Sequence, residues 1–133
     1  MTRRANNKMN AKRVLVAEDD DLLREIVCAG LADEGFDVVA ASDGAVALEL
    51  FRERGPYDAL LLDEEMPHLT GRQLLARLRA AGERVAALLI SGNLEIDDDE
   101  RTNLGVARVI RKPASLDDIC EALHQEIEGQ AAI

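Results

Sequence analysis

Aromatic side chains are scarce in this sequence, which has one tyrosine, two phenylalanines and no tryptophan among 133 residues. The hydrophobic residues, which make up 47% of the chain, are therefore mostly aliphatic. A buried core has to be built from leucine, valine, isoleucine and alanine. A chain of this length fits one domain that buries such a core without disulfides or structural metals.

Cysteine is also scarce, and Cys28 and Cys120 form neither a CxxC pair nor a cluster with histidine. This excludes a thiol-based metal site or redox centre, so we expect two buried thiols on helix faces. No signal-peptide pattern and no long apolar run occurs in the sequence. The sequence therefore predicts a cytoplasmic protein with no membrane segment.

Positive charge is concentrated at the start of the chain. Residues 1–13 hold five of the 16 basic residues and no acid, which leaves 11 basic against 26 acidic residues in the remainder. A body this acidic repels phosphate backbones, so we expect no direct binding of nucleic acid by the folded part. We expect residues 1–12 to form a basic, solvated tail.

Short β-branched runs alternate with amphipathic stretches along the rest of the chain. Strands are predicted at 14–17, 36–41, 59–62, 85–90 and 106–110. A helix is predicted after each strand, although the segment 93–105 is poor in apolar residues. Five such units predict an α/β fold in which one open, doubly wound parallel sheet carries helices on both faces. We expect this domain to span residues 13–128 and a short C-terminal tail to follow at 129–133.

Polar residues follow four of the predicted strands. They are Glu18, Asp19 and Asp20 after the first strand, Asp63, Glu64 and Glu65 after the third, Ser91 after the fourth and Lys112 after the fifth. Because the carboxyl ends of parallel strands share one edge of the sheet, we expect these groups to converge there. Lys112 is the only lysine after residue 12 in a chain that otherwise uses arginine, which favours a chemical role for its compact ammonium.

Convergence of these groups suits phosphoryl transfer. Crowded carboxylates attract a hard divalent cation, so Glu18, Asp19 and Asp63 are candidate Mg²⁺ ligands. A carboxylate is also a nucleophile that can form an acyl phosphate. The ammonium of Lys112 and the hydroxyl of Ser91 would neutralise and orient the phosphoryl oxygens.

The order and spacing of these motifs resemble the receiver domains of two-component response regulators. The resemblance covers residues 13–128 and rests on VLVAEDD at 14–20, LLDEEMP at 61–67, LISG at 89–92 and RKP at 111–113. Gly71, four residues after the proline of the second motif, also matches. The resemblance implies a flavodoxin-like fold with strand order 2-1-3-4-5. It also implies a cis bond between Lys112 and Pro113.

For the site, the resemblance implies that Asp63 is the phosphoacceptor. Mg²⁺ (or Mn²⁺) would be held by Glu18, Asp19, Asp63 and the backbone carbonyl of Glu65. The phosphoryl group would contact Ser91 and Lys112, the polar residues that follow the fourth and fifth predicted strands.

For function, the resemblance implies a phosphorelay signalling module rather than an enzyme. Its phosphoryl donor would be a sensor histidine kinase or a phosphotransfer protein, and phosphorylation would switch the binding of a downstream protein partner. We expect a monomer or a weak dimer. Few residues follow the last predicted helix, so we expect a stand-alone receiver or a piece of a larger regulator or hybrid kinase.

Two positions depart from the family pattern. Val109 stands where members often have an aromatic residue, and a β-branched side chain cannot swing inward as an aromatic does. We therefore expect a phosphoryl signal to leave through the segment 93–105, which should have low local stability. The second departure is Glu65, an acid that could reach the metal or disfavour an anionic donor.

Three alternatives to a phosphorylated receiver remain open. A haloacid dehalogenase-type phosphatase would use Asp63 as nucleophile and Glu65 as general acid, but no cap insertion is evident. A flavodoxin-type cofactor protein would need a first loop that cradles phosphate, whereas the acids from Glu18 onward would repel it. A receiver-like binding module that is never phosphorylated would be indicated by loss of Asp63 or Lys112, and both are present.

Overall fold

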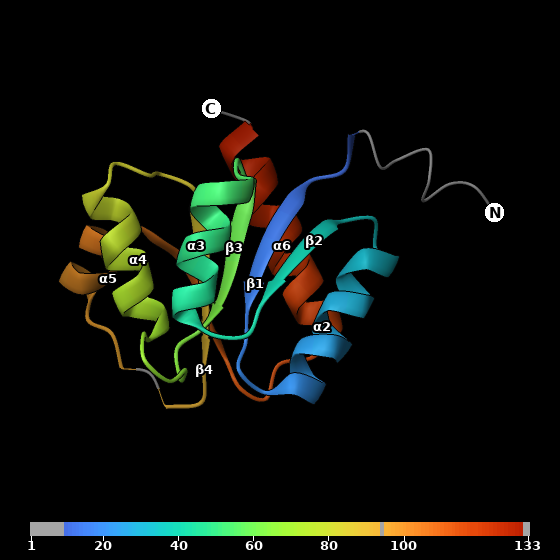
Figure 1. Cartoon of the computed structure of the whole chain (residues 1–133), viewed down its shortest axis with the longest axis horizontal. Helices are drawn as coiled ribbons and strands as arrows, with labels where there is room; N and C mark the ends of the chain where they lie inside the picture. Colours follow the sequence, from blue (N-terminus) through green and yellow to red (C-terminus); the bar gives the residue numbers. More distant parts are fainter. Residues whose placement is uncertain (1–9, 94, 132–133) are drawn as a thin grey trace.

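Five parallel strands form a single sheet in the computed structural model, which describes residues 10–93 and 95–131 (Figure 1). The strands are β1 (Arg13–Ala17), β2 (Asp37–Ala41), β3 (Ala59–Asp63), β4 (Ala86–Ser91) and β5 (Val106–Arg111). The helices are α2 (Asp21–Asp33), α3 (Gly44–Arg54), α4 (Gly71–Ala80), α5 (Asp98–Leu104) and α6 (Leu116–Ala131). The strand order β2-β1-β3-β4-β5 confirms the predicted topology.

The ends of the chain differ in how they relate to the prediction. Residues 1–9 of the expected basic tail lie outside the described residues. At the other end α6 continues to Ala131, so residues 129–131 are helical where we expected a short tail to begin. None of the helices within the described ranges is long and apolar enough to cross a membrane.

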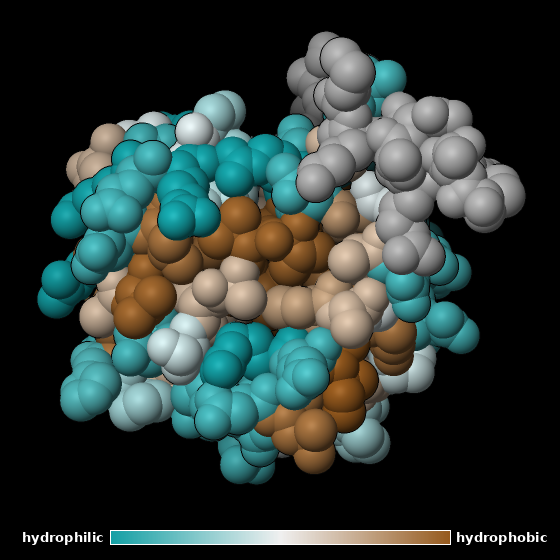
Figure 2. Space-filling model, turned by 45° about the vertical axis from the view of Figure 1, so that its right-hand side comes forward, coloured by the Kyte–Doolittle hydropathy of each residue, from teal (hydrophilic) through white to brown (hydrophobic). Residues whose placement is uncertain are grey.

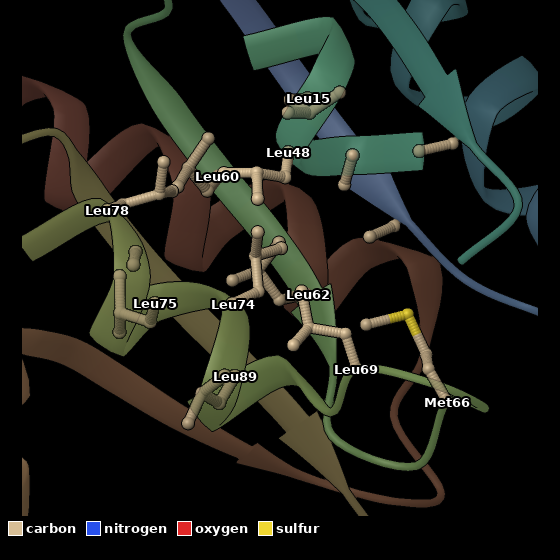
Figure 3. Packing of buried hydrophobic residues seen from close by; sticks show 14 of the residues in the cluster. Leu15, Leu48, Leu60, Leu62, Met66, Leu69, Leu74, Leu75, Leu78 and Leu89 are labelled. Atoms are coloured by element: carbon tan, nitrogen blue, oxygen red, sulfur yellow. The ribbon is translucent and has the colours of Figure 1, made fainter. Parts of the chain in front are cut away.

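The sheet separates two aliphatic clusters. Along β1, Leu15 and Ala17 face a cluster that includes leucines of α3 and α4, whereas Val14 and Val16 face a second cluster with side chains of α2 and α6. Figure 3 shows the first cluster, in which leucines from the strands and from α3 and α4 converge. Because side chains alternate along a strand, a central strand covered on both faces must be apolar throughout, and every residue of β3 is buried.

Aspartate side chains begin three of the helices. Asp20, Asp43 and Asp97 each accept a hydrogen bond from a backbone N–H three residues later, at 2.9, 2.8 and 2.8 Å. For α5, this places the acidic run that starts at Asp97 in the N-cap and the first turn, where carboxylates stabilise the positive end of the helix dipole. Gly105, with φ of 63°, ends the same helix. These caps explain why a helix forms in a segment with so few apolar residues.

Arginines of α4 hold α5 in place. No residue of α5 is buried, and among the described residues from 95 to 105 only Ile96 and Leu104 pack partly against the core. The Arg79 side chain donates from Nε to the carbonyl of Leu104 at 2.7 Å and from Nη2 to that of Gly105 at 3.0 Å. Burial lowers the pKa of Arg79, so the guanidinium that donates to these carbonyls is partly desolvated. The attachment of α5 is therefore largely polar.

Two smaller expectations can also be compared with the structure. The Lys112–Pro113 bond is cis, as the resemblance implied, and the Gly55–Pro56 bond is cis as well. Both cysteines are free, but Cys28 is only partly buried whereas Cys120 is buried, so the expectation of two buried thiols was wrong for Cys28. Burial raises the pKa of both thiols, which disfavours the reactive thiolate.

Replacing Arg79 with methionine should loosen α5 selectively. The variant keeps most of the aliphatic stem but loses both hydrogen bonds to the carbonyls that follow α5. We expect hydrogen exchange of residues 98–105 to become at least about fivefold faster, which corresponds to the loss of ~1 kcal/mol. Arg77→Met, an exposed position in the same helix, is the matched control. Equal exchange in the two variants would show that α5 does not depend on Arg79.

Candidate functional site

Backbone hydrogen bonds carry the sheet one residue past the ends of its strands. Glu18 N–H donates to Ala41 at 3.1 Å, Glu64 N–H to Ile90 at 2.9 Å and Lys112 N–H to the carbonyl of Ser91 at 3.0 Å. These bonds fix the residues after β1, β3 and β5, together with Ser91 at the end of β4, at one edge, the lower edge of the sheet in Figure 1. The structure thus brings Glu18, Asp63, Ser91 and Lys112 to the same edge, as predicted.

Three carboxylates meet at this edge. One oxygen from each of Glu18, Asp19 and Asp63 lies within 4.8 Å of the other two. Glu18 and Asp63 are buried, with 8% and 3% exposure, while Asp19 is exposed. Burial, reinforced by hydrogen bonding and repulsion from Asp63, raises the pKa of Glu18 to about 8. These carboxylates are hard oxygen donors that repel one another, and a divalent cation would relieve that repulsion.

Lys112 is the cation that faces these acids. Its Nζ lies 3.0 Å from Oδ2 of Asp63 and 3.9 Å from Oε1 of Glu65. Partial burial would lower the pKa of Lys112, but the hydrogen bond to Asp63 and the surrounding carboxylates outweigh it and raise that pKa. Lys112 therefore stays charged and neutralises part of the acidic edge.

Ser91 has two partners. It is fully buried, and its Oγ accepts a hydrogen bond from the backbone N–H of Asn93 at 3.1 Å. The same hydroxyl donates to the carboxylate of Glu65. The sequence left open whether the side chain of Glu65 reaches the metal site or opposes an anionic donor. In the structure this side chain is directed toward Ser91 and Lys112 and is not part of the cluster formed by the other three carboxylates. A metal-binding role for its backbone carbonyl stays a prediction.

Sequence reasoning did not foresee the role of Glu64. The residue is only 7% exposed, and its two side-chain oxygens accept hydrogen bonds from the backbone N–H and from Nε of Arg72, at 2.8 and 3.0 Å. Nη1 of Arg72 reaches on to Glu100 of α5, at 2.8 Å. The residue beside Asp63 is therefore linked by one arginine to α5. The only sequence signal was an arginine directly after Gly71.

Gly71 lies against the end of β3 at the start of α4. A Cβ at this position would lie 2.8 Å from the carbonyl oxygen of Asp63 and 3.2 Å from Cα of Glu64. Both contacts are with backbone, which cannot move aside without shifting the acids. Only glycine fits this approach, which explains its place four residues after the proline.

A family model for the response regulator receiver domain matches residues 14–124. The chain belongs to this family. As a receiver domain, it is a phosphoacceptor signalling module of two-component systems, and such modules are not generally classed as enzymes. Membership excludes the phosphatase and flavodoxin-type alternatives.

Individual proteins support the same assignment. The receiver domain is 30% identical over 120 residues to regulatory protein AtoC and 32% identical over 124 residues to transcriptional regulatory protein QseB, both from Escherichia coli. Each match covers 90% of this chain but only 26% and 56% of the relative, so the chain spans about a quarter to a half of these proteins. The receiver domain of a Francisella response regulator superposes with a TM-score of 0.80 at 26% identity, covering 90% of this chain and 98% of that one.

Glu18 should make the stability of the metal-free receiver domain depend on pH. Between its ordinary pKa of 4.5 and its folded pKa of about 8, the folded chain holds a proton that the unfolded chain has released. The free energy of unfolding should therefore fall as pH rises through this window, by at most about 5 kcal/mol. Glu18→Gln cannot ionise and should give a flatter profile with higher stability at pH 8.

Urea unfolding between pH 4 and 9, with a chelator present, measures this effect. Glu53→Gln, an exposed position on α3, is the matched control and should behave as the unmodified chain does. If the free energy of unfolding of Glu18→Gln changed with pH in parallel with that of the unmodified chain, Glu18 would not be the cause of the pH dependence.

Proposed function

We propose that Asp63 accepts a phosphoryl group from the phosphohistidine of a sensor histidine kinase or a phosphotransfer protein. The observation that carries this proposal is the position of the Asp63 carboxylate, which is buried beside those of Glu18 and Asp19 and lies 3.0 Å from the ammonium of Lys112. We further propose that Mg²⁺ (or Mn²⁺) is held by Glu18, Asp19, Asp63 and the backbone carbonyl of Glu65. The cytoplasmic location and the monomeric or weakly dimeric state remain predictions.

The chemistry follows from the residues. An oxygen of Asp63 attacks phosphorus, the P–N bond to the donor imidazole breaks, and the imidazole leaves with the bonding electrons. Lys112 already lies 3.0 Å from Oδ2 of Asp63, so its charge offsets the negative charge that collects on the transferred group. The hydroxyl of Ser91 orients a phosphoryl oxygen. When bound, the cation supplies additional neutralisation of phosphoryl and carboxylate oxygens.

An apolar surface beside the site suits a protein donor. Leu22, Leu23 and Ile26 of α2 are exposed by 67%, 38% and 52%, which is unusual for large aliphatic side chains on one helix. A hollow of about 500 Å³ lined by Leu23, Ile26 and side chains around Pro113 lies next to them and reaches Glu18 and Lys112. Figure 2 brings the side that carries α2 and β2 forward and shows apolar areas among hydrophilic ones. We propose that the donor protein docks here, with its phosphohistidine facing Asp63.

Phosphorylation should depend on the Asp63 carboxylate. Incubation with acetyl phosphate and Mg²⁺ should add one phosphoryl group, measured by intact mass and located by peptide mapping. Asp63→Asn keeps the shape of the side chain but lacks the anionic nucleophile and should not be labelled. Asp99→Asn, an exposed position on α5, is the control and should be labelled normally. Full labelling of Asp63→Asn would refute the assignment.

The docking surface can be separated from the chemistry with a second variant. Ile26→Asp places a charge on the apolar surface and should slow transfer from a phosphorylated histidine phosphotransfer protein at least about tenfold, the effect of losing ~1.4 kcal/mol of binding. Labelling by acetyl phosphate should not change, because this donor needs no docking. Val46→Asp, another exposed aliphatic position on α3, is the control. If Ile26→Asp left transfer from the protein unchanged, the donor would have to dock elsewhere.

A further inference from the structure

Both groups proposed to bind the phosphoryl oxygens already face a carboxylate of the chain. Ser91 donates its hydroxyl hydrogen to Glu65, and Nζ of Lys112 lies 3.9 Å from Oε1 of the same side chain. The carboxylate of Glu65 thus contacts both of the proposed phosphate-binding groups.

The hydroxyl of Ser91 has only one hydrogen to donate. It accepts from the N–H of Asn93 and donates to Glu65, so a phosphoryl oxygen can gain that hydrogen only after Glu65 has lost it. An incoming phosphoryl group also carries roughly two negative charges, which would repel a carboxylate beside it. The single hydroxyl hydrogen of Ser91 and the repulsion between like charges therefore both prevent the Glu65 carboxylate and a phosphoryl group from lying beside Ser91 and Lys112 at the same time.

Glu65 is able to move out of the way. Its side chain is 47% exposed, so it can turn into water, whereas that of Asp63 is 3% exposed. Its backbone is held in place because Glu65 N–H donates to Oδ1 of Asp63 at 3.0 Å. The expected movement is a rotation of one side chain while the backbone near the metal site stays fixed.

We infer that Glu65 is a resident anion that occupies the phosphoryl-binding position of the unphosphorylated chain and must be displaced before Asp63 can be phosphorylated. The inference rests on the proposed function of Asp63. It follows that Glu65 selects among phosphoryl donors by charge: the more negative the donor, the more its approach is opposed. A docked protein donor can offset this opposition with its own contacts, whereas a small anionic donor cannot.

Two small donors of different charge test the inference. At pH 7 acetyl phosphate is mostly a dianion and phosphoramidate mostly a monoanion, and labelling of Asp63 by each can be followed by intact mass. Glu65→Gln keeps an oxygen that accepts from Ser91 but removes the charge. We expect it to speed labelling by acetyl phosphate about tenfold and labelling by phosphoramidate only about threefold, because one charge about 4 Å away acts on half as much donor charge. Glu53→Gln, which changes net charge alone, should leave both rates unchanged.

A binding measurement without phosphoryl transfer gives a second readout. The ¹³C resonance of the Glu65 carboxyl, assigned by its loss in Glu65→Gln, should shift when beryllofluoride and Mg²⁺ are added, because the side chain exchanges Ser91 for water. Rates that are equal to or lower than the unmodified rate in Glu65→Gln, or an unmoved resonance, would overturn the inference while Asp63 labelling stands. Failure of every variant to be labelled would instead overturn the proposed function, and the inference with it.

Discussion

Electrostatic repulsion at the carboxyl edge of the sheet is the constraint around which the rest of the structure is arranged. The backbone ladder that continues past the strands leaves Glu18 and Asp63 little freedom to separate. Water cannot screen them well, because both are buried. Such an arrangement is stable because aliphatic clusters on both sheet faces hold the strands in register, because Lys112 supplies one compensating charge, and because the raised pKa of Glu18, about 8, lets it keep a proton. The same repulsion supports the proposal that a divalent cation binds at this edge.

The fold and the members of the site were largely predictable from the sequence. Strand position follows from short aliphatic runs, and a polar residue directly after a buried parallel strand has to lie at the carboxyl edge. Asp63, Ser91 and Lys112 were found by that rule alone. What the rule does not give is the direction of side chains beyond the strand. Glu64 and Glu65 are adjacent acids of the same type, yet one turns inward to Arg72 and the other toward Ser91.

The unpredicted features share a physical cause, which is that they depend on partners distant in sequence. Arg72 lies 28 residues from Glu100 and Arg79 lies 25 residues from Leu104. Neither pair leaves a periodic signal, because a long side chain can reach in several directions from an exposed helix face. Arginine and lysine side chains have different roles in this structure. The guanidinium groups of the arginines link helices and loops through several hydrogen bonds, whereas the single ammonium of Lys112 lies where one compact charge is needed.

The polar attachment of α5 has an evolutionary consequence. Since Leu104 is the only residue of this helix that packs against a cluster, substitutions at its other positions leave the two aliphatic clusters intact as long as the caps and the contacts with the two arginines are kept. Its outward positions can therefore diverge between duplicated copies of such a domain without a loss of folding. Such positions can change the charge and shape of the surface of the domain without a change in its core.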